Sequence, residues 1–170
     1  MPYGIRVYVR LMDRLADWVG LVAMYLIFVM IGVLLTDVVS DKIFSLPLHW
    51  CVEVAQFTLA AYYFMGGAKT LKDNDHVRMD LFYATLSERN QARMDAVTVF
   101  CLIFYLCVML WGSLSSLSYS WATDQRLPSI WNPSLVPIKV LMVGCLILML
   151  LQSFSLLFKY VAASRGEQLE

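Results

Sequence analysis

The feature that most constrains this chain is a set of four long stretches without charged side chains, the second interrupted only by Glu53. A helix needs roughly 20 apolar residues, at about 1.5 Å each, to cross a hydrocarbon core about 30 Å thick. Each stretch is close to that length or longer. The sequence therefore predicts four membrane-spanning helices, drawn from residues 18–36, 43–68, 96–123 and 140–158.

Lys and Arg residues are distributed unequally between the two sides of such a bundle. Ten of the thirteen precede the first stretch, lie between the second and third, or follow the fourth. The other three are Lys42, Arg126 and Lys139. Because Lys and Arg are enriched in short cytoplasmic loops, both termini and the middle loop are predicted to be cytoplasmic.

The composition excludes an ordinary soluble domain and several classes of partner. Hydrophobic residues make up 60% of the chain, whereas soluble domains average about 45–50%. A net charge of zero argues against a nucleic-acid partner, and no Lys/Arg cluster along the sequence is dense enough to predict a dedicated anionic-lipid site. The four Cys residues form no Cys-x-x-Cys pair, so we expect them to pack as small apolar residues.

The fold class predicted is all-α integral membrane, with four tilted helices in one domain, residues 1–170. Over residues 4–17, apolar residues recur at helical spacing opposite Arg and Asp residues, which predicts an amphipathic helix at the membrane interface. The alternative is a solvated helical extension. Pro-rich sequence makes the connection before the last helix non-helical. The expected spans are residues 18–38, 48–71, 88–121 and 137–159.

Glu53 lies well inside the second stretch, where a carboxylate is expected to face protein rather than lipid. At helical spacing Gln56, Ala60, Tyr63 and Gly67 fall on the same face. The second helix is therefore predicted to present one polar, small-residue packing stripe.

Two roles for Glu53 are open. It is either the coupling group of a small transporter or a structural partner of Lys139, of Arg126 or of another subunit. The structural role is favoured because no second carboxylate lies inside a stretch. Our hypothesis is an ion pair between Glu53 and Lys139.

Small residues recur at positions that allow close approach of helices. Gly112, Ser116 and Ser120 are spaced by four, and Gly66 and Gly67 lie near the end of the second helix. Such patterns let helices pack closely in a membrane, either within the bundle or against another protein.

The sequence predicts no active site. It has no Ser/His/Asp set, metal-ligand cluster or phosphate-binding loop. The two histidines are His49 and His76, which are not facing ligands inside spans, so a haem site is not expected. We expect no catalytic residue, cofactor or metal, and a protein that is not an enzyme.

Several short motifs resemble those of one transporter family. Trp-Cys-Val-Glu opens the second helix at residues 50–53, Gly-Gly-Ala closes it at 66–68, and His-Val-Arg-Met-Asp follows at 76–80. Together with the stretch 133–152, their order resembles the small membrane (Q) subunit of tripartite ATP-independent periplasmic (TRAP) transporters. Ser87 departs from the Pro that is common there. The candidate interface or structural polar residues are Trp50, Glu53, Gln56, Gly66, Gly67, His76, Arg78, Asp80 and Lys139.

The resemblance implies a location, partners and a role. The location would be a bacterial inner membrane, with membrane lipid around the chain. The partners would be a large permease subunit that carries the substrate and sodium sites and a periplasmic receptor that delivers an organic anion, often a carboxylate. The small subunit would be a fixed scaffold in sodium-coupled, elevator-like transport. The alternative is a stand-alone, proton-coupled, multidrug-type transporter that uses Glu53.

Overall fold

A computed structural model describes residues 3–45, 48–73 and 88–164. Four α-helices account for most of them, and the described residues contain no β-strand. The helices are α1 (Tyr3–Val39), which continues into a π-helical turn η1 (Ser40–Phe44), α2 (Cys51–Asp73), α4 (Glu88–Ala122) and α5 (Val136–Ser164). Ser87, Pro47 and the middle loop lie outside the described residues.

The amphipathic segment and the first span form one continuous helix. α1 has no break near residue 17, and its helical path runs past the expected end at residue 38 through η1. The path ends at Ser45, whose φ of 54° is left-handed. The first 15 residues of α1 are therefore rigidly tied to the apolar part that follows.

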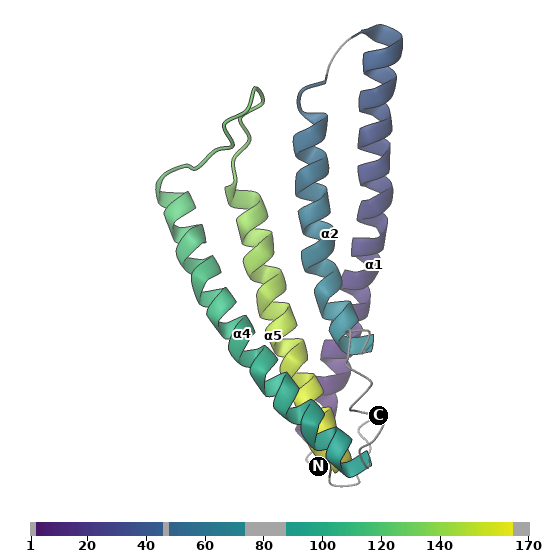
Figure 1. Cartoon of the computed structure of the whole chain (residues 1–170), viewed down its shortest axis with the longest axis vertical. Helices are drawn as coiled ribbons and strands as arrows, with labels where there is room; N and C mark the ends of the chain where they lie inside the picture. The colour runs from purple at the N-terminus through teal and green to yellow at the C-terminus, as the bar shows by residue number, and fades with distance from the viewer. Residues whose placement is uncertain (1–2, 46–47, 74–87, 165–170) are drawn as a thin grey trace.

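The helices lie side by side in the order α4, α5, α2, α1, and α4 lies at one edge (Figure 1). α2 packs against both α1 and α5, and α5 also packs against α4. The helices approach one another where α1 and α4 begin and α2 and α5 end (Figure 1). We call this the convergent end and the opposite one the divergent end.

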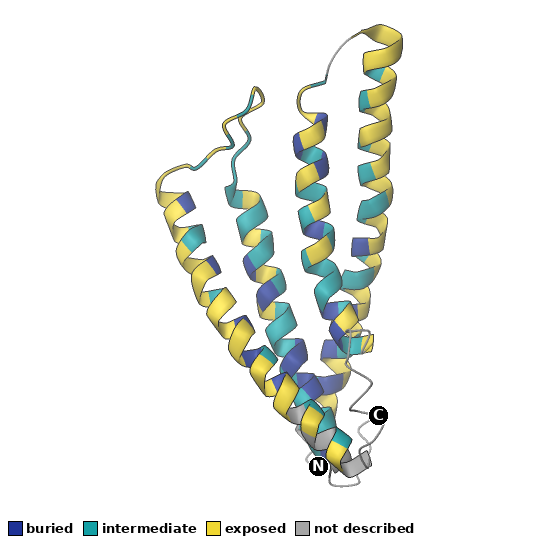
Figure 2. Ribbon diagram, in the orientation of Figure 1, coloured by how far each residue is buried: buried dark blue, intermediate teal, exposed yellow. Residues whose placement is uncertain are grey.

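The core lies at the convergent end. Val99 and Ile103 of α4 bury against Leu156 of α5, and Phe154, Leu157 and Tyr160 flank them. Towards the divergent end α1 and α4 are mostly exposed (Figure 2). Exposed apolar helices are stable in lipid, where each helix satisfies its own backbone hydrogen bonds.

Among the described residues, three helical segments are long and apolar enough to cross a membrane: Ile5–Phe44, Val97–Ala122 and Val136–Ala162. α2 does not meet that criterion, although the sequence predicted four spans. The physical reason is the polar content of α2, which includes Glu53, Gln56, Lys69, Lys72 and Asp73.

The connection between α4 and α5 is non-helical, as its prolines predict. It folds back on itself: the Leu127 N–H donates to the Pro133 carbonyl at 3.0 Å, and the Leu135 N–H donates to the Gln125 carbonyl at 3.0 Å. This fold holds Gln125 over the divergent ends of α4 and α5.

Candidate functional site

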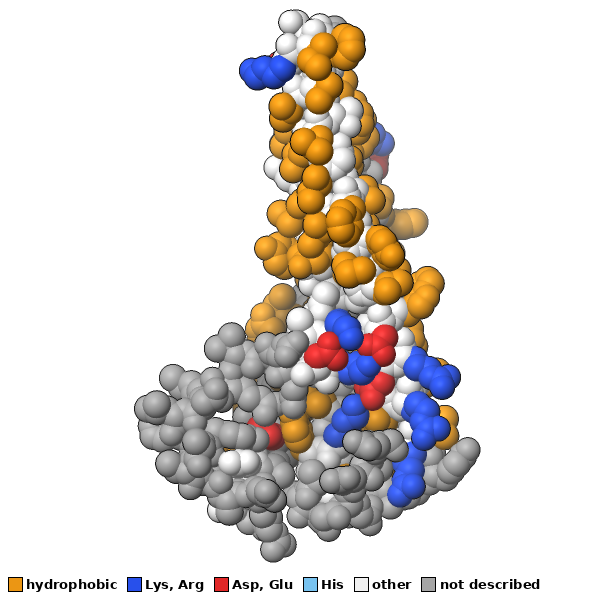
Figure 3. Space-filling model, turned by 90° about the vertical axis from the view of Figure 1, so that its right-hand side faces the viewer, with side chains coloured by type: hydrophobic (Ala, Val, Ile, Leu, Met, Phe, Trp, Pro, Cys, Tyr) orange, Lys and Arg blue, Asp and Glu red, His pale blue; other side chains and the backbone are white. Residues whose placement is uncertain are grey.

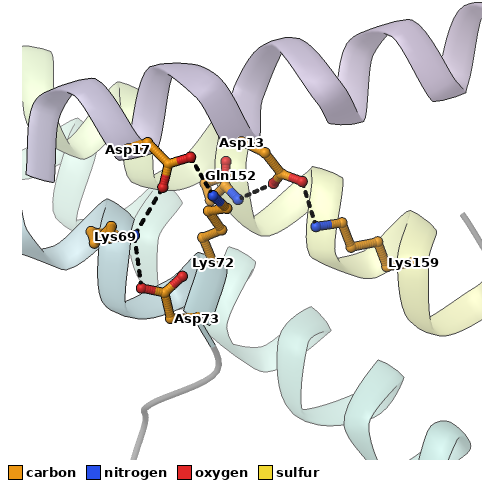
Figure 4. Close-up of polar contacts among 7 residues, drawn as sticks. All are labelled: Asp13, Asp17, Lys69, Lys72, Asp73, Gln152 and Lys159. Carbon is orange, nitrogen blue, oxygen red and sulfur yellow. Dashed lines mark hydrogen bonds and ion pairs between the residues drawn. The ribbon is translucent and has the colours of Figure 1, made fainter. Parts of the chain in front are cut away.

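An ion-pair cluster joins α1 to α2 at the convergent end (Figure 4). The Asp17 carboxylate accepts from Lys69 Nζ at 2.8 Å and from Lys72 Nζ at 2.5 Å. Lys69 also pairs with Asp73, one turn further along α2, at 3.0 Å. These groups are partly exposed, so the cluster fixes the register of the two helices more than it adds stability.

A second group of contacts joins α1 to α5. Asp13 accepts from Lys159 Nζ at 2.8 Å and from the Gln152 amide at 3.0 Å (Figure 4). One turn earlier, the Tyr8 hydroxyl donates to the Leu151 carbonyl at 2.8 Å, and its ring packs edge-on against Phe158. The amphipathic part of α1 thus packs its inward face on protein.

Glycine allows two close approaches between helices. A Cβ at Gly20 of α1 would lie 2.9 Å from the Lys69 side chain, and one at Gly67 of α2 would lie 2.8 Å from Met149 Sδ of α5. At Gly66, Gly112 and Gly144 no atom of the described residues lies within 4 Å of that position. Gly67 therefore packs within the chain, whereas Gly66 faces open space.

Lys139 is the centre of a polar cluster at the divergent end. Its Nζ donates to Ser116 Oγ at 2.9 Å, to Ser120 Oγ at 2.5 Å and to Gln125 Oε1 at 3.0 Å. The Ser120 side chain is fully buried and also donates to Gln125 at 2.6 Å. Two members of the predicted Gly112, Ser116 and Ser120 row thus bind an ammonium group rather than pack against a helix.

We expect Lys139→Met to destabilise the chain by about 1–3 kcal/mol, because it leaves buried and partly buried hydroxyl and amide oxygens without their donor. Loss of helical circular dichroism on titration with denaturing detergent measures this. The matched control is Lys42→Met, whose ammonium is exposed and pairs with Asp41; it should change stability by less than about 0.5 kcal/mol. Equal losses in the two variants contradict the prediction.

The hypothesised ion pair between Glu53 and Lys139 is wrong. Within the described residues Glu53 makes no ion pair, and its buried Oε2 has no hydrogen-bond partner. The physical reason is geometric. Lys139 lies on α5 and turns toward the hydroxyls of α4, while Glu53 belongs to α2 on the other side of α5.

The residues predicted to form one packing stripe on α2 do not share one environment: some face the bundle and others are exposed. Glu53 is buried and Gly67 packs against α5, whereas Gln56 and Tyr63 are exposed. The exposed residues continue at spacings of three and four along α2, which places them on one face. We call this face the open stripe of α2; it consists of the exposed residues Val52, Gln56, Leu59, Tyr63 and Thr70, together with Gly66, which is partly buried but has space at its Cβ position.

The open stripe places polar groups where lipid would otherwise lie. Tyr63 is 68% exposed, and the Gln56 amide has no hydrogen-bond partner among the described residues. An amide unpaired in hydrocarbon costs several kcal/mol. The stripe is therefore better suited to contact protein than lipid.

Of the remaining candidate residues, one is described by the structure and three are not. Trp50 is 39% exposed beside the start of α2. His76, Arg78 and Asp80 lie outside the described residues. Sequence reasoning missed Asp13 and Asp17 as helix-joining residues, because it assigned them to the polar side of the amphipathic segment, facing away from the apolar residues. Their spacing of four beside an apolar face was the available clue.

The arrangement offers packing surfaces rather than reactive groups. No group of three His, Cys, Asp or Glu in the described ranges is placed to hold a metal ion. The four cysteines are free thiols, at positions 51, 101, 107 and 145.

Comparison with known proteins identifies the family. No curated protein matches the chain. Residues 30–162 match the family model described as tripartite ATP-independent periplasmic transporters, DctQ component. The match covers α2, α4 and most of α5, together with the last part of α1. The chain therefore belongs to the DctQ family, the small membrane component of TRAP transporters.

Proposed function

We propose that this small TRAP subunit is a fixed scaffold for the large permease subunit in a bacterial inner membrane. In this proposal the large subunit moves the substrate, transport is sodium-coupled, and a periplasmic binding protein delivers an organic anion such as a carboxylate. DctQ proteins work with a DctM large permease and a DctP binding protein. Family membership supports these partners, and the open stripe of α2 supports the scaffold role.

We place α2 across the membrane as a fourth span, with both termini cytoplasmic. At about 1.5 Å per residue, its 23 residues are long enough to cross the hydrocarbon core. α1 and α5 flank it on two sides, so only one face needs further cover. The convergent end holds most of the described Lys and Arg residues, and by the positive-inside rule this supports a cytoplasmic location for that end.

The observation that carries the scaffold role is the open stripe of α2. In membranes, helices associate through small residues that allow close approach and through polar groups that find partners across the interface. Gly66 supplies the first feature, and Gln56 and Tyr63 supply the second. We propose that a transmembrane helix of the large subunit packs along this stripe.

The other candidate residues have separate proposed roles. We assign Glu53, Gly67 and Lys139 to packing within the chain, and Trp50 to the outer membrane interface. His76, Arg78 and Asp80 stay candidates for contact with the large subunit from the cytoplasmic side.

Affinity purification combined with a transport assay tests the proposal. The tagged chain, extracted from its native membrane in mild detergent, should co-purify with one large permease protein. The chain alone in liposomes should be inactive, and adding the large subunit and the binding protein should give sodium-dependent uptake. Transport by the chain alone that is lost in Glu53→Gln would instead establish the proton-coupled alternative.

A further inference from the structure

The first part of α1 carries three arginines that face away from the bundle. Arg6, Arg10 and Arg14 are spaced by four, so they form one row along the helix, and all are exposed. A parallel row consists of Val7, Leu11 and Leu15, which are 49%, 54% and 40% exposed. We call the two rows together the basic-apolar face of α1. Figure 3 shows Lys and Arg side chains gathered below a long hydrophobic surface on this side of the molecule.

These arginines differ from the other cations whose side chains are described. Lys42, Lys69, Lys72, Arg126 and Lys159 each pair with an Asp, and Lys139 binds hydroxyl and amide oxygens. Within the described residues, Arg6, Arg10 and Arg14 have no carboxylate partner. The basic-apolar face therefore has positive charge that no carboxylate among the described residues neutralises.

The apolar row continues directly into the surface that lipid would cover. Trp18, one turn after Arg14, is 70% exposed, and Leu21, Tyr25 and Phe28 beyond it are 50–64% exposed. Trp prefers the boundary between hydrocarbon and headgroups. At the standard helical rise, Arg14, Arg10 and Arg6 lie about 6, 12 and 18 Å below Trp18 along the axis. Arg14 thus reaches the headgroup layer, and Arg10 lies within about one to two Debye lengths of it.

We propose that the basic-apolar face of α1 binds the headgroups of anionic phospholipids, phosphatidylglycerol being the simplest. Guanidinium groups bind phosphate oxygens in pairs. Beyond Trp18, the exposed side chains of Leu21, Tyr25 and Phe28 contact the adjoining acyl chains. Arg14 makes the strongest contribution and Arg6 the weakest, in the order of their distance from Trp18. The three arginines are four residues apart in sequence, so they form no dense cluster there, but the helix aligns them on one face. The density of Lys and Arg along the sequence therefore did not predict a lipid site.

Quenching of Trp18 by brominated lipid tests the inference. The chain has five Trp residues, so Trp50, Trp111, Trp121 and Trp131 are replaced by Phe to leave Trp18 alone. The full chain is reconstituted into vesicles that contain bromine in either phosphatidylglycerol or phosphatidylcholine, with total lipid composition unchanged. Both leaflets have the same composition, so the result depends neither on orientation nor on a partner subunit.

We expect phosphatidylglycerol to associate at Trp18 at least about threefold more strongly than phosphatidylcholine, since each basic residue near a surface favours anionic lipid. The triple variant Arg6→Gln/Arg10→Gln/Arg14→Gln should bring that ratio to about one. The triple Arg→Lys variant should keep most of the preference for phosphatidylglycerol. The matched control, Lys42→Gln/Arg126→Gln, removes cations at the divergent end and should leave the ratio unchanged.

Three outcomes overturn the inference. The first is equal quenching by both lipids in the parent chain, and the second is a ratio that survives the triple Gln substitution. The third is weak quenching by both lipids, which means that protein covers this face. If the triple variant does not fold, raising the salt concentration on the parent chain must reduce the ratio, because the attraction is screened; a salt-independent ratio counts against the inference.

Discussion

Replacing Gly66 by Leu is expected to reduce the large permease subunit that co-purifies with this chain to about a tenth or less. Gly66 faces open space in the chain itself, with nothing within 4 Å of where a Cβ would lie. A Leu there leaves the fold intact and even improves helix propensity by about 1 kcal/mol. Against a partner helix the same side chain prevents close approach, and overpacking of about 1–3 kcal/mol is enough for a tenfold loss.

Other open glycines provide the matched controls. Gly32 of α1, Gly112 of α4 and Gly144 of α5 likewise have nothing within 4 Å. Leu at each of these positions should leave co-purification within about twofold of the parent, since they lie off the open stripe of α2. Quantitative mass spectrometry of both subunits after purification measures the ratio. If Gly66→Leu keeps the complex while one of the other three loses it, the interface lies on that other helix.

Replacing Asp13 by Ala is expected to lower the free energy of unfolding by about 2 kcal/mol, because hydrogen bonds to charged groups are worth about 1.5–3 kcal/mol. Asp13 binds both Lys159 and Gln152, and the two charged side chains are only 23% and 27% exposed. Without the carboxylate, the partly buried ammonium group of Lys159 and the fully buried amide of Gln152 lose their acceptor. The change should separate the start of α1 from α5 and leave α4 in place, since α4 packs on α5 through the core at Val99 and Ile103.

Detergent-induced unfolding of Asp13→Ala, Lys159→Met and the double variant gives the coupling between the two side chains. A double-mutant cycle should show at least about 0.5 kcal/mol of coupling, as for residues in direct contact. Asp41→Ala is the control, since its pair with Lys42 is largely exposed and such pairs are worth about 0–1 kcal/mol. Additive losses for Asp13 and Lys159 would show that they act independently.

The helices and the family could be predicted from the sequence because both depend on contiguous residues. The expected third span, 88–121, differs from α4 (Glu88–Ala122) by one residue, and the last expected span, 137–159, lies inside α5 (Val136–Ser164). Uncharged runs of that length have few stable conformations in lipid other than helix. The short motifs at residues 50–53, 66–68 and 133–152 indicated the family that the matched region 30–162 establishes.

The partners of individual side chains were harder to predict from the sequence, as Glu53 and Lys139 illustrate. Both are near the same end of their helices in sequence, which made an ion pair plausible. The way each helix is rotated against its neighbours decided otherwise, and Lys139 binds three side-chain oxygens on α4 and the following loop. Helical spacing alone gives relative angles within one helix and contains no information on where adjacent helices lie.

By itself, the sequence determined an all-helical chain with long apolar segments, and it determined the family, because hydrophobic run length and short motifs are properties of contiguous residues. Only the tertiary structure decided how one polar stripe on α2 divides, with Glu53 buried and Gln56 exposed. It also decided that Asp13 and Asp17 join three helices, while three nearby arginines face outward. The reason is that burial and pairing depend on how helices distant in sequence rotate and pack against one another.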